Sequence, residues 1–446
     1  MLQKRAHVIG LGISGISAAK LLMDKGWQVV ASDDKTQLDN SDEVLQLQQR
    51  GMEVHLGGHD RAAGQTVQFV IVSPGVRFDA DVLKLRRSQG VELIGEAELG
   101  WRYCQGKLVA VTGSNGKSTV TAMLGEIFAQ TDQPSFTCGN IGLPICDIAS
   151  QTTNDSLIAM EISSYQLMSI KDFKPQISVL TGISPDHLDY HGTFDNYLEA
   201  KARIWMNQTS SEYLVYNSDD AIVRRLVENA RPQKVPISSE MSSECNTGIM
   251  DNSLYANPTE TLSAKVAIND FKLPGRHNQA NALAAMCAAL LIGVSPDQVE
   301  AGVKAFEGLP HRLEKVRKLD QTLYINDSKA TNPESTICAL EAMDRPVVLI
   351  AGGLSKGGGF KMLRDLISAK VRQLILIGEC AGEIEADLGD VCPVQNVAGL
   401  KEAVNLAAIS SYEGYAVLLS PMAASFDMFK NYEDRGDQFK AFVNKL

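Results

Sequence analysis

The segment Lys107–Thr119, KLVAVTGSNGKST, constrains the fold of this chain most strongly. It begins with an apolar run, turns at Gly113 and Gly116, and continues with Lys117 and Ser118 at the start of a helical pattern. A strand, a glycine-rich turn and a helix in this order point backbone N–H groups at an anion, while the lysine reaches the outer phosphates and the hydroxyl can bind Mg²⁺. The segment therefore predicts a phosphate-binding loop for a nucleoside triphosphate.

The match to the general form of this loop is partial. The pattern G-x-x-x-x-G-K-[ST] requires a glycine at position 111, where the chain has Val111. An ordinary glycine-rich turn between a strand and a helix is therefore the alternative interpretation of this segment when it is taken alone.

Strand-like runs alternate with helical patterns through most of the sequence. This alternation predicts an α/β fold built from mostly parallel sheets. A chain of 446 residues corresponds to about three domains of about 100–200 residues each, which we place at residues 1–97, 98–308 and 309–446. The polar stretch 238–263 is interpreted as a small β excursion, and the turn residues of the segment 308–314 predict a hinge.

The charge balance argues against a nucleic-acid partner, because 42 Lys and Arg residues face 53 Asp and Glu residues for a net charge of −11. The eight cysteines are dispersed and form no Cys-x-x-Cys pair, as in a protein of the reducing cytoplasm. The longest apolar helical pattern, residues 282–292, is shorter than the roughly 18 residues that a membrane span needs. We therefore expect a cytoplasmic protein with no membrane segment.

A second glycine-rich turn lies near the start of the chain. Gly10, Gly12 and Gly15 follow a strand-like run in G-x-G-x-x-G spacing, and Asp33 follows the next strand. This pattern is typical of a fold that binds a dinucleotide, and alone it favours an NAD-dependent oxidoreductase as much as another diphosphate-binding turn. Two phosphate sites on successive α/β domains, however, suit an enzyme that joins a nucleotide-linked substrate to ATP chemistry. The first domain would then bind the diphosphate of a substrate.

Chemically active side chains follow several other strand-like runs. Glu161 ends a buried-strand pattern, where a carboxylate needs a metal ion, an ion pair or water as a partner. His187 lies in PDHLDYHG, at the end of the next such run, and a loop histidine of this kind commonly faces solvent. Lys201 lies in a helical pattern and, on composition alone, is interpreted as a surface lysine.

The last part of the chain carries three polar strand ends, NDSKATNPEST, GGLSKGGGF and SPMAASFDMFKNYEDRG. Open α/β sheets bind ligands at the carboxyl ends of their strands. These segments therefore predict a site on the edge of the third domain, and ordinary connecting loops are the alternative.

Taken together, the motifs strongly resemble those of the Mur ligase family of bacterial peptidoglycan synthesis. The segments GLGISG, SPG, TGSNGKST, CGNIGLP, EISSYQL, DHLDYHG, GRHNQANALAA, GLPHRLE, NDSKATNPEST and SPMAASFDMFKNYEDRG occur in family order over essentially the whole chain. The first domain and the C-terminal segment resemble most the members that add D-glutamate. The resemblance implies a Rossmann-like UDP-binding domain, a P-loop-type ATPase central domain and a C-terminal amino-acid-binding domain similar to a dinucleotide-binding fold. We also expect a monomer.

The reaction that the resemblance implies is ATP-driven amide formation. The carboxylate of UDP-N-acetylmuramoyl-L-alanine first accepts the γ-phosphoryl group, and the amine of D-glutamate then attacks the acyl phosphate. Lys117 would stabilise the transferring phosphoryl group. Of two implied Mg²⁺ sites, Ser118 and Glu161 would hold one, and Glu161, His187 and a carbamylated Lys201 the other. The carbamate would supply the oxygen ligand that Mg²⁺ prefers.

The resemblance also implies three sets of ligand-binding residues. Around ATP it places Gly113, Ser114, Asn115, Gly116, Lys117, Ser118, Thr119, Asn281, Arg312 and Asp327, with His311 among them. Around the UDP-linked substrate it places Ile13, Ser14, Asp33, Asp34, Ser73 and Asn140. Around D-glutamate it places Thr331, Lys356, Ser425, Phe426 and Tyr432.

Two other classes of protein remain as alternatives. One is an NAD-dependent oxidoreductase with an incidental phosphate loop, and the other is a nucleotide-dependent binding switch without chemistry. Neither accounts for the polar loops of the third domain.

Overall fold

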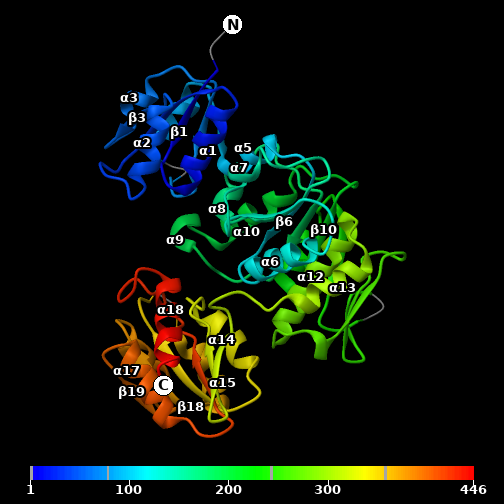
Figure 1. The fold of residues 1–446 in the computed structure, drawn as a ribbon, viewed down its shortest axis with the longest axis vertical. Helices are drawn as coiled ribbons and strands as arrows, with labels where there is room; N and C mark the ends of the chain where they lie inside the picture. Colours follow the sequence, from blue (N-terminus) through cyan, green and yellow to red (C-terminus); the bar gives the residue numbers. More distant parts are fainter. Residues whose placement is uncertain (1–3, 78–79, 242–244, 356–358) are drawn as a thin grey trace. The chain divides into compact units, whose positions relative to one another are not determined.

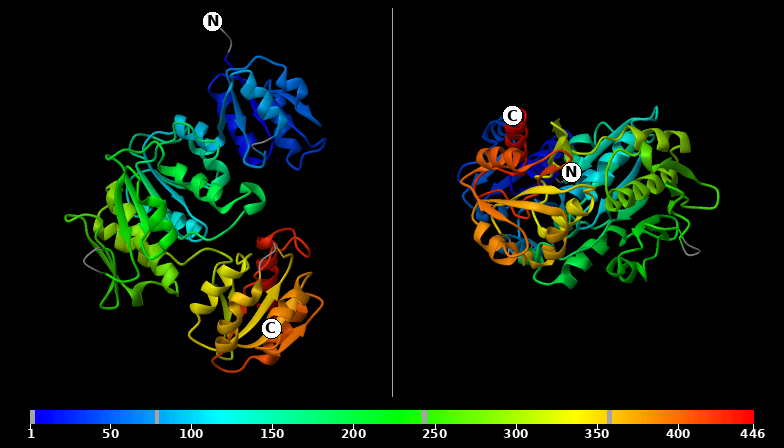
Figure 2. Two further views of the ribbon diagram at one scale, coloured as in Figure 1. Left: turned by 180° about the vertical axis from the view of Figure 1, so that it is seen from behind. Right: turned by 90° about the horizontal axis from the view of Figure 1, so that it is seen from below.

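The computed structural model describes residues 4–77, 80–241, 245–355 and 359–446, and Figures 1 and 2 show its course. Contacts between Cα atoms divide the chain into two compact units. The first unit comprises residues 1–271 and 280–306, and the second comprises residues 272–279 and 307–446. The boundary at residue 307 falls just before the predicted hinge, which stays a prediction.

The N-terminal part of the first unit is a five-stranded parallel sheet in the order β3-β2-β1-β4-β5. Its strands are β1 Arg5–Ile9, β2 Gln28–Asp33, β3 Glu53–Leu56, β4 Phe69–Val72 and β5 Glu92–Gly95, and its helices are α1 Ile13–Asp24, α2 Ser41–Gln49, α3 Asp60–Ala63 and α4 Asp81–Ser88. The order reverses between β1 and β4, and ligands of such sheets bind at the carboxyl ends of the strands at this switch point.

Alternate strand residues of this sheet pack against different helices. Ala6 and Val8 of β1 pack with α1 and α2, whereas Ile9 of β1 and Val30 of β2 pack with residues of α3 and α4. Both faces are therefore buried, as expected of a parallel sheet, and the strands read as nearly continuous apolar runs for this reason.

The remainder of the first unit is built on a six-stranded parallel sheet in the order β11-β10-β9-β6-β8-β7. Its strands are β6 Lys107–Thr112, β7 Ser135–Gly139, β8 Leu157–Glu161, β9 Ile177–Leu180, β10 Tyr213–Asn217 and β11 Gln233–Ile237. The helices are α5 Glu96–Tyr103, α6 Lys117–Phe128, α7 Ile145–Ile148, α8 Ser164–Leu167, α9 Leu188–His191, α10 Phe194–Ala202, η1 Arg203–Trp205, α11 Ala221–Val227, η2 Ile268–Asp270, α12 Arg276–Ile292 and α13 Pro296–Ala305. The phosphate loop follows β6, and β6 lies between β8 and β9 in the sheet.

The predicted β excursion is confirmed as a separate antiparallel sheet of three strands, β12 Gly248–Met250, β13 Ser253–Ala256 and β14 Ala264–Ala267. It lies between β11 and α12 in the chain and is part of the green and yellow-green segment in Figure 2. Its last strand lies entirely after residue 263, where the polar stretch that predicted the excursion ends.

The second unit contains a six-stranded sheet in the order β15-β16-β20-β17-β18-β19, in which β15 is antiparallel to β16 and the other pairs are parallel. The strands are β15 Glu314–Leu319, β16 Thr322–Asn326, β17 Val347–Gly352, β18 Val371–Ile377, β19 Val394–Asn396 and β20 Ala416–Leu419. The helices are α14 Pro333–Glu341, η3 Phe360–Leu363, α15 Arg364–Lys370, α16 Ala381–Leu388, α17 Leu400–Ser410 and α18 Tyr432–Val443. Leu349 of β17 packs with α14, α15 and α16, and its neighbour Ile350 packs with α17 and α18.

The predicted fold class, α/β with mostly parallel sheets, is confirmed.

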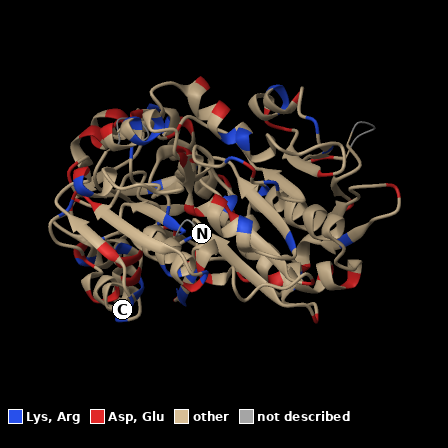
Figure 3. Cartoon of the chain, turned by 90° about the horizontal axis from the view of Figure 1, so that it is seen from above, with Lys and Arg blue, Asp and Glu red and all other residues tan. Residues whose placement is uncertain are grey.

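Lys and Arg residues are interspersed with Asp and Glu residues on the face drawn in Figure 3. Among the described residues, no helix has both the length and the apolar character needed to cross a membrane.

Candidate active site

The phosphate loop has the backbone that its glycines predicted. Gly113 and Gly116 have φ angles of +146° and +88°, a region that side chains rarely allow. A Cβ at Gly113 would collide with the hydroxyl of Thr181, and one at Gly116 would collide with the side-chain amide of Asn281. Gly116 is the N-cap of α6 and brings no side chain to its first turn. Such a helix N-terminus, opening at Lys117, is suited to an anion.

The other predicted loop residues occupy the same place. Ser114 and Asn115 lie in the turn, and Ser118 and Thr119 lie in the first turn of α6, both largely buried. The Lys117 ammonium donates to the carbonyl oxygens of Gly113 and Ser114, at 2.9 Å each. Lys117 therefore folds over the loop, where an outer phosphate would meet its positive charge.

Lys201 of α10 is buried beside this loop, with 2% of its surface exposed. Its Nζ donates to the carbonyl oxygen of Gly113 at 2.6 Å and lies 4.6 Å from the centre of the Tyr197 ring. Burial, aided by the charge of Lys117, holds the pKa of Lys201 well below its usual value. The interpretation of Lys201 as a surface lysine is therefore wrong, because the helix carries it into the sheet edge rather than into solvent.

Glu161 ends β8 and is buried, with 1% of its surface exposed. Its Oε1 accepts a hydrogen bond of 2.6 Å from Asn140 Nδ2. Its Oε2 is buried and has no hydrogen-bond partner among the described residues. A buried carboxylate oxygen in this state is costly without a cation or a donor. The Glu161 carboxylate and the Ser118 hydroxyl are oxygen donors of the kind that suit a hard divalent ion such as Mg²⁺.

His187 lies at the N-cap of α9 in a left-handed conformation, with φ of +54°. Its Nε2 is 3.4 Å from Asp186 Oδ2, and its ring lies 5.1 Å from that of Tyr165. Within the described parts of the chain, no three His, Cys, Asp or Glu side chains form a ready-made metal site. The second site implied by the resemblance, with Lys201 as a carbamylated ligand, stays a prediction.

Sequence reasoning missed Tyr197, which supports the predicted loop residue Ser114. Ser114 Oγ lies 2.9 Å from the hydroxyl of Tyr197 and donates to Ser184 O at 2.8 Å. His191 Nε2 lies 3.0 Å from Ser164 Oγ, and burial lowers the pKa of His191. Tyr197 precedes Lys201 by one helical turn, so the spacing of the two on α10 was the available signal.

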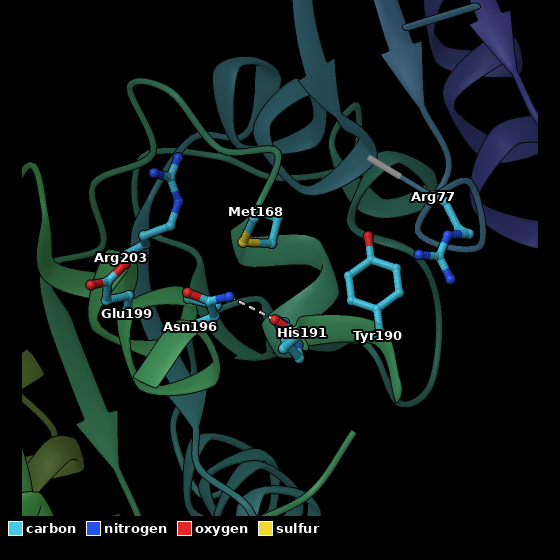
Figure 4. Close-up of a pocket in the computed structure, with 8 residues that line it drawn as sticks. Arg77, Met168, Tyr190, His191, Asn196, Glu199 and Arg203 are labelled. Carbon is cyan, nitrogen blue, oxygen red and sulfur yellow. Dashed lines mark hydrogen bonds between the residues drawn. The ribbon is translucent and has the colours of Figure 1, made fainter. Parts of the chain in front are cut away.

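A pocket of about 510 Å³ lies beside the aromatic residues of this site (Figure 4). Residues on or next to α8, α9, α10 and η1 form most of it, and Arg77 contributes from the loop after β4. Arg203 is held there by the carbonyl oxygens of Leu167 and Ile170, at 2.6 and 2.7 Å. The pocket is lined by Arg77, Met168, Tyr190, His191, Asn196, Glu199, Ala200 and Arg203. The sequence had not singled out either arginine.

The N-terminal glycine turn lies at the switch point of its sheet. Ser73 Oγ donates to the carbonyl oxygen of Gly10 at 2.7 Å, and a Cβ at Gly15 would collide with that same carbonyl. At Gly12, by contrast, a Cβ would meet no atom within 4 Å. The first and third glycines are thus required by close packing, and Ser73 closes the turn from the neighbouring strand.

The structure brings five of the six residues predicted around the UDP-linked substrate to this edge. They are Ile13, Ser14, Asp33, Asp34 and Ser73, at the ends of β1, β2 and β4. Ile13 is 77% exposed although it is apolar. Asn140 lies instead in the central sheet, where it bonds Glu161, so its place in the substrate set stays a prediction.

In the second unit, Asp327 lies buried after β16. It accepts hydrogen bonds from Ser420 Oγ at 2.8 Å and from the backbone N–H of Leu313 at 3.2 Å, and burial raises its pKa to about 7. His311 is buried beside Asn326 in a left-handed conformation, with φ of +62°. The predicted nucleotide residues of this unit, including Arg312, therefore gather around the end of β16.

The residues predicted for D-glutamate follow neighbouring strands of the same sheet. Ser425 is buried and Phe426 is 69% exposed, while Lys329 Nζ lies 3.6 Å from the centre of the Tyr432 ring. Thr331 follows β16 in the same loop as Lys329. The predicted Lys356 lies outside the described residues.

Arg435 joins two of these loops and was not predicted. Its buried guanidinium donates to Ser328 O at 2.8 Å, to Ser328 Oγ at 2.9 Å and to Ala423 O at 3.2 Å. The loops after β16 and β20 are therefore tied together below the predicted D-glutamate residues. Its place in the NYEDRG segment was the only sequence signal.

The phosphate loop with Lys117, the buried Lys201 beside it and the glycine turn of the preceding sheet define an α/β protein of the nucleoside-triphosphate-binding class. The chain matches the Mur ligase MurD-like N-terminal domain over residues 4–95, the Mur ligase middle domain over 111–289 and the Mur ligase glutamate ligase domain over 311–422. It therefore belongs to the Mur ligase family. Members of this family are ATP-dependent ligases of peptidoglycan precursor synthesis, and this chain is an ATP-dependent, ADP-forming ligase.

Full-length relatives agree with this membership, and solved structures share the fold. UDP-N-acetylmuramoylalanine--D-glutamate ligase of Caldanaerobacter subterraneus subsp. tengcongensis is 38% identical over 448 residues, covering 100% of this chain and 99% of the relative. The protein of that name from Thermoanaerobacter sp. is 39% identical over 447 residues, covering 99% and 98%. MurF from Acinetobacter baumannii shares the fold with a TM-score of 0.65 at 19% identity, over 98% of this chain and 93% of that one. MurF from Thermotoga maritima, solved with ADP, does so with a TM-score of 0.62 at 16% identity, over 94% and 95%.

Proposed function

We propose that this chain joins D-glutamate to UDP-N-acetylmuramoyl-L-alanine, with ATP converted to ADP and phosphate. The observation that carries the proposal is the arrangement at the phosphate loop. Lys117 and the buried Lys201 both donate to the Gly113 carbonyl, and the buried Glu161 ends the strand beside β6. These residues suit phosphoryl transfer, and the full-length relatives named for this reaction support the choice of substrates.

The first step transfers the γ-phosphoryl group to the substrate carboxylate. The carboxylate oxygen bonds to phosphorus, the bond to the β-phosphate oxygen breaks, and ADP leaves. Lys117 faces the oxygens on which negative charge collects, and the N-terminus of α6 faces the phosphates behind them. In the second step the amine of D-glutamate attacks the acyl carbon, loses a proton, and expels phosphate.

Mg²⁺ would neutralise phosphate charge at this site and orient the transferring group. Glu161 and the Ser118 hydroxyl would hold one ion, and Glu161 and His187 would hold a second together with Lys201. The unpartnered Oε2 of Glu161 supports a cation at this place. The number of ions is part of the proposal.

Lys201 would serve as a carbamate. Its burial favours the neutral amine, which is the form that adds CO₂. The amine nitrogen bonds to the carbon of CO₂ and releases one proton, which leaves a carboxylate-type group in place of an ammonium that cannot bind a cation. Tyr197 and the Gly113 carbonyl hold this side chain at the loop.

The substrates would be divided among three domains, at residues 1–97, 98–308 and 309–446. The N-terminal glycine turn would bind the UDP portion, and the pocket beside Arg77 would take the sugar and alanyl portion on its way to the phosphate loop. The loops after β16, β17 and β20 would bind D-glutamate. We further propose that the chain acts as a monomer in the cytoplasm.

A substrate-omission assay tests this proposal. Purified protein is given ATP and Mg²⁺ with UDP-N-acetylmuramoyl-L-alanine and D-glutamate together, with each alone, or with L-glutamate in place of D-glutamate. Sustained phosphate release is expected only with the complete set. The product should carry the mass of the substrate plus glutamate minus water. Phosphate release that is independent of both substrates, with no such product, would contradict the proposal.

A further inference from the structure

A chain of hydrogen bonds crosses the N-terminal sheet and ends at one of the two acids predicted to face the UDP-linked substrate. It begins at Arg86 of α4 and passes through His7 of β1 and Ser32 of β2. It continues to His59, in the turn after β3, and ends at Asp34, directly after β2. The distances along it are 3.1 Å from the Arg86 guanidinium to His7 Nδ1, 2.7 Å from His7 Nε2 to Ser32 Oγ, 2.8 Å from Ser32 Oγ to His59 Nδ1 and 3.0 Å from His59 Nε2 to Asp34 Oδ1.

The inner part of this chain is buried. Arg86 is 1% exposed, and His7 and Ser32 are fully buried. The other described groups that accept from the Arg86 guanidinium are the carbonyl oxygens of Gln65 and Ala62 and the side-chain amide of Gln89, not a carboxylate. A buried cation placed in this way is costly unless its charge is matched elsewhere. The hydrogen-bonded chain links it to a carboxylate at the sheet edge.

The identity of the first donor fixes the direction of the first two bonds. A guanidinium only donates, so His7 Nδ1 must accept and the neutral ring carries its proton on Nε2. Burial, together with the charge of Arg86, lowers the pKa of His7 to about 3, which keeps the ring neutral. His7 then donates to Ser32 Oγ. The Ser32 hydroxyl keeps its own proton, which the relay assigns to the bond with His59 Nδ1. The Nε2–H of His59 is left to donate to Asp34.

The backbone holds His59 against the segment that carries Asp34. The N–H groups of Gly57 and Gly58 donate to the carbonyl oxygens of Lys35 and Asp33, at 3.0 and 3.1 Å. Both glycines have positive φ angles, +78° and +142°, which other residues adopt only with strain. The turn after β3 is therefore fixed on the turn after β2.

The two neighbouring acids have different surroundings. Asp33 accepts the backbone N–H of Leu11 at 2.7 Å with one oxygen and that of Lys35 at 2.9 Å with the other. It thereby holds the glycine turn and the start of the next loop. The Asp34 side chain is 83% exposed, and His59 donates to it from the protein side. Asp34 therefore presents a carboxylate to solvent near the switch point of the sheet. Asp33 instead stabilises the backbone at Leu11 and Lys35.

We propose that Arg86, His7, Ser32 and His59 form a positioning relay that orients the Asp34 carboxylate to accept hydrogen bonds from the uridine of the UDP-linked substrate. The donors on that ligand are the ribose hydroxyls and the uracil N3–H. This inference rests on the proposed function for the identity of the ligand. Asp34 is the residue that touches the substrate, and the other four act through it.

Ser32→Ala is the variant that cuts the relay with the smallest change of volume. The probe is UDP, titrated calorimetrically into the full-length protein. A hydrogen bond to a charged group is worth about 1.5–3 kcal/mol, so Asp34→Ala should raise the Kd for UDP about 10- to 100-fold. Ser32→Ala should raise it about 3- to 10-fold, because the carboxylate remains but loses its orientation. The KM for the UDP-linked substrate should rise likewise, with kcat and the KM for ATP unchanged.

A double variant separates positioning from general loss of structure. In the Asp34→Ala background, Ser32→Ala should cause no further loss of UDP affinity, since the relay has nothing left to orient. Ser178→Ala is the matched control, because Ser178 is a buried strand serine with two hydrogen bonds in the central sheet. It should leave the Kd for UDP unchanged. An equal loss from Ser32→Ala in both backgrounds would overturn the proposal.

Histidine nitrogen NMR of the full-length protein supplies a second readout. With ¹⁵N-labelled histidine, the seven ring systems are assigned by substitution. His59 should carry its proton on Nε2 with an accepting Nδ1, and Ser32→Ala should remove the hydrogen-bond shift at Nδ1. A proton on Nδ1 of a neutral His59 would overturn the relay. If UDP binding depends on Asp34, and on Ser32 only while Asp34 is present, but no glutamate-containing product forms, the proposed function fails and the relay stands.

Discussion

The burial of His7 predicts a specific loss of stability in acid, which native-state hydrogen exchange can measure. An unfolded histidine has a pKa of about 6.5, whereas burial and the charge of Arg86 lower the pKa of folded His7 to about 3. Between about pH 6.5 and pH 3, His7 therefore binds a proton in the unfolded chain but not in the folded chain. The stabilisation is complete above about pH 6.5 and is lost as the pH falls towards 3.

The magnitude follows from the two pKa values. Between pH 7.5 and pH 5.0 the pH passes below the unfolded pKa of about 6.5 by about 1.5 pH units. Each of these pH units lowers the free energy of opening by about 1.36 kcal/mol, so the free energy of opening the N-terminal sheet should fall by about 2 kcal/mol. Any folded pKa below about 4 gives nearly the same result, because the folded ring then stays neutral throughout this window.

The assay compares the parent with His7→Gln, whose amide does not titrate and can still donate to Ser32. Protection of the β1 and β2 peptides is followed at both pH values after correction for intrinsic exchange. Glu96, whose pKa burial raises to about 7, acts with the opposite sign, since its stabilisation is lost as the pH rises from about 4.5 to 7. It is present in both proteins and cancels in the comparison. Equal losses in the parent and in His7→Gln would refute the reasoning.

Three further predictions concern the active site. Lys201→Ala should lower turnover about 10²- to 10³-fold, and short carboxylic acids added to the assay should restore part of it; normal turnover of this variant in CO₂-depleted buffer would contradict the carbamate. Glu161→Gln keeps an acceptor for Asn140 but loses the charge, so the Mg²⁺ concentration for half-maximal activity should rise about 10-fold or more, and an unchanged Mg²⁺ dependence would remove Glu161 from the metal site. Ser425→Ala should weaken the use of D-glutamate about 10- to 100-fold while the KM for ATP stays the same, and a rise in the ATP KM alone would place Ser425 elsewhere.

Much of the fold and part of the site could be predicted from local sequence. Each glycine turn follows a short, continuous apolar run. A strand with this pattern is buried on both faces, as strands of parallel sheets are, so the parallel sheets could be predicted. Gly113 and Gly116 were recognised because their spacing reflects backbone conformations that side chains disfavour. The antiparallel strand β15 carries no such signal, since alternation of strands and helices does not specify the direction of an edge strand.

The burial of Lys201 and the relay to Asp34 depend on long-range packing. Lys201 is buried because α10 places it against the Gly113 carbonyl, and three strands separate these two residues in the chain. A lysine in an amphipathic helical pattern gives no local sign of this. His7 stands in an apolar run that predicts a buried strand, but its partner Arg86 lies on a helix that follows three later strands. Such pairings follow from the topology and cannot be read from spacing.

The path of one oxygen atom tests the central claim most directly. UDP-N-acetylmuramoyl-L-alanine labelled with ¹⁸O in its alanyl carboxylate is turned over with ATP and D-glutamate, and the released phosphate is analysed by mass spectrometry. If the carboxylate is phosphorylated and then attacked by the amine, the bridging oxygen leaves with phosphorus, and each phosphate should carry one ¹⁸O from a fully labelled substrate. Unlabelled phosphate, released together with the glutamate-containing product, would contradict the acyl-phosphate mechanism.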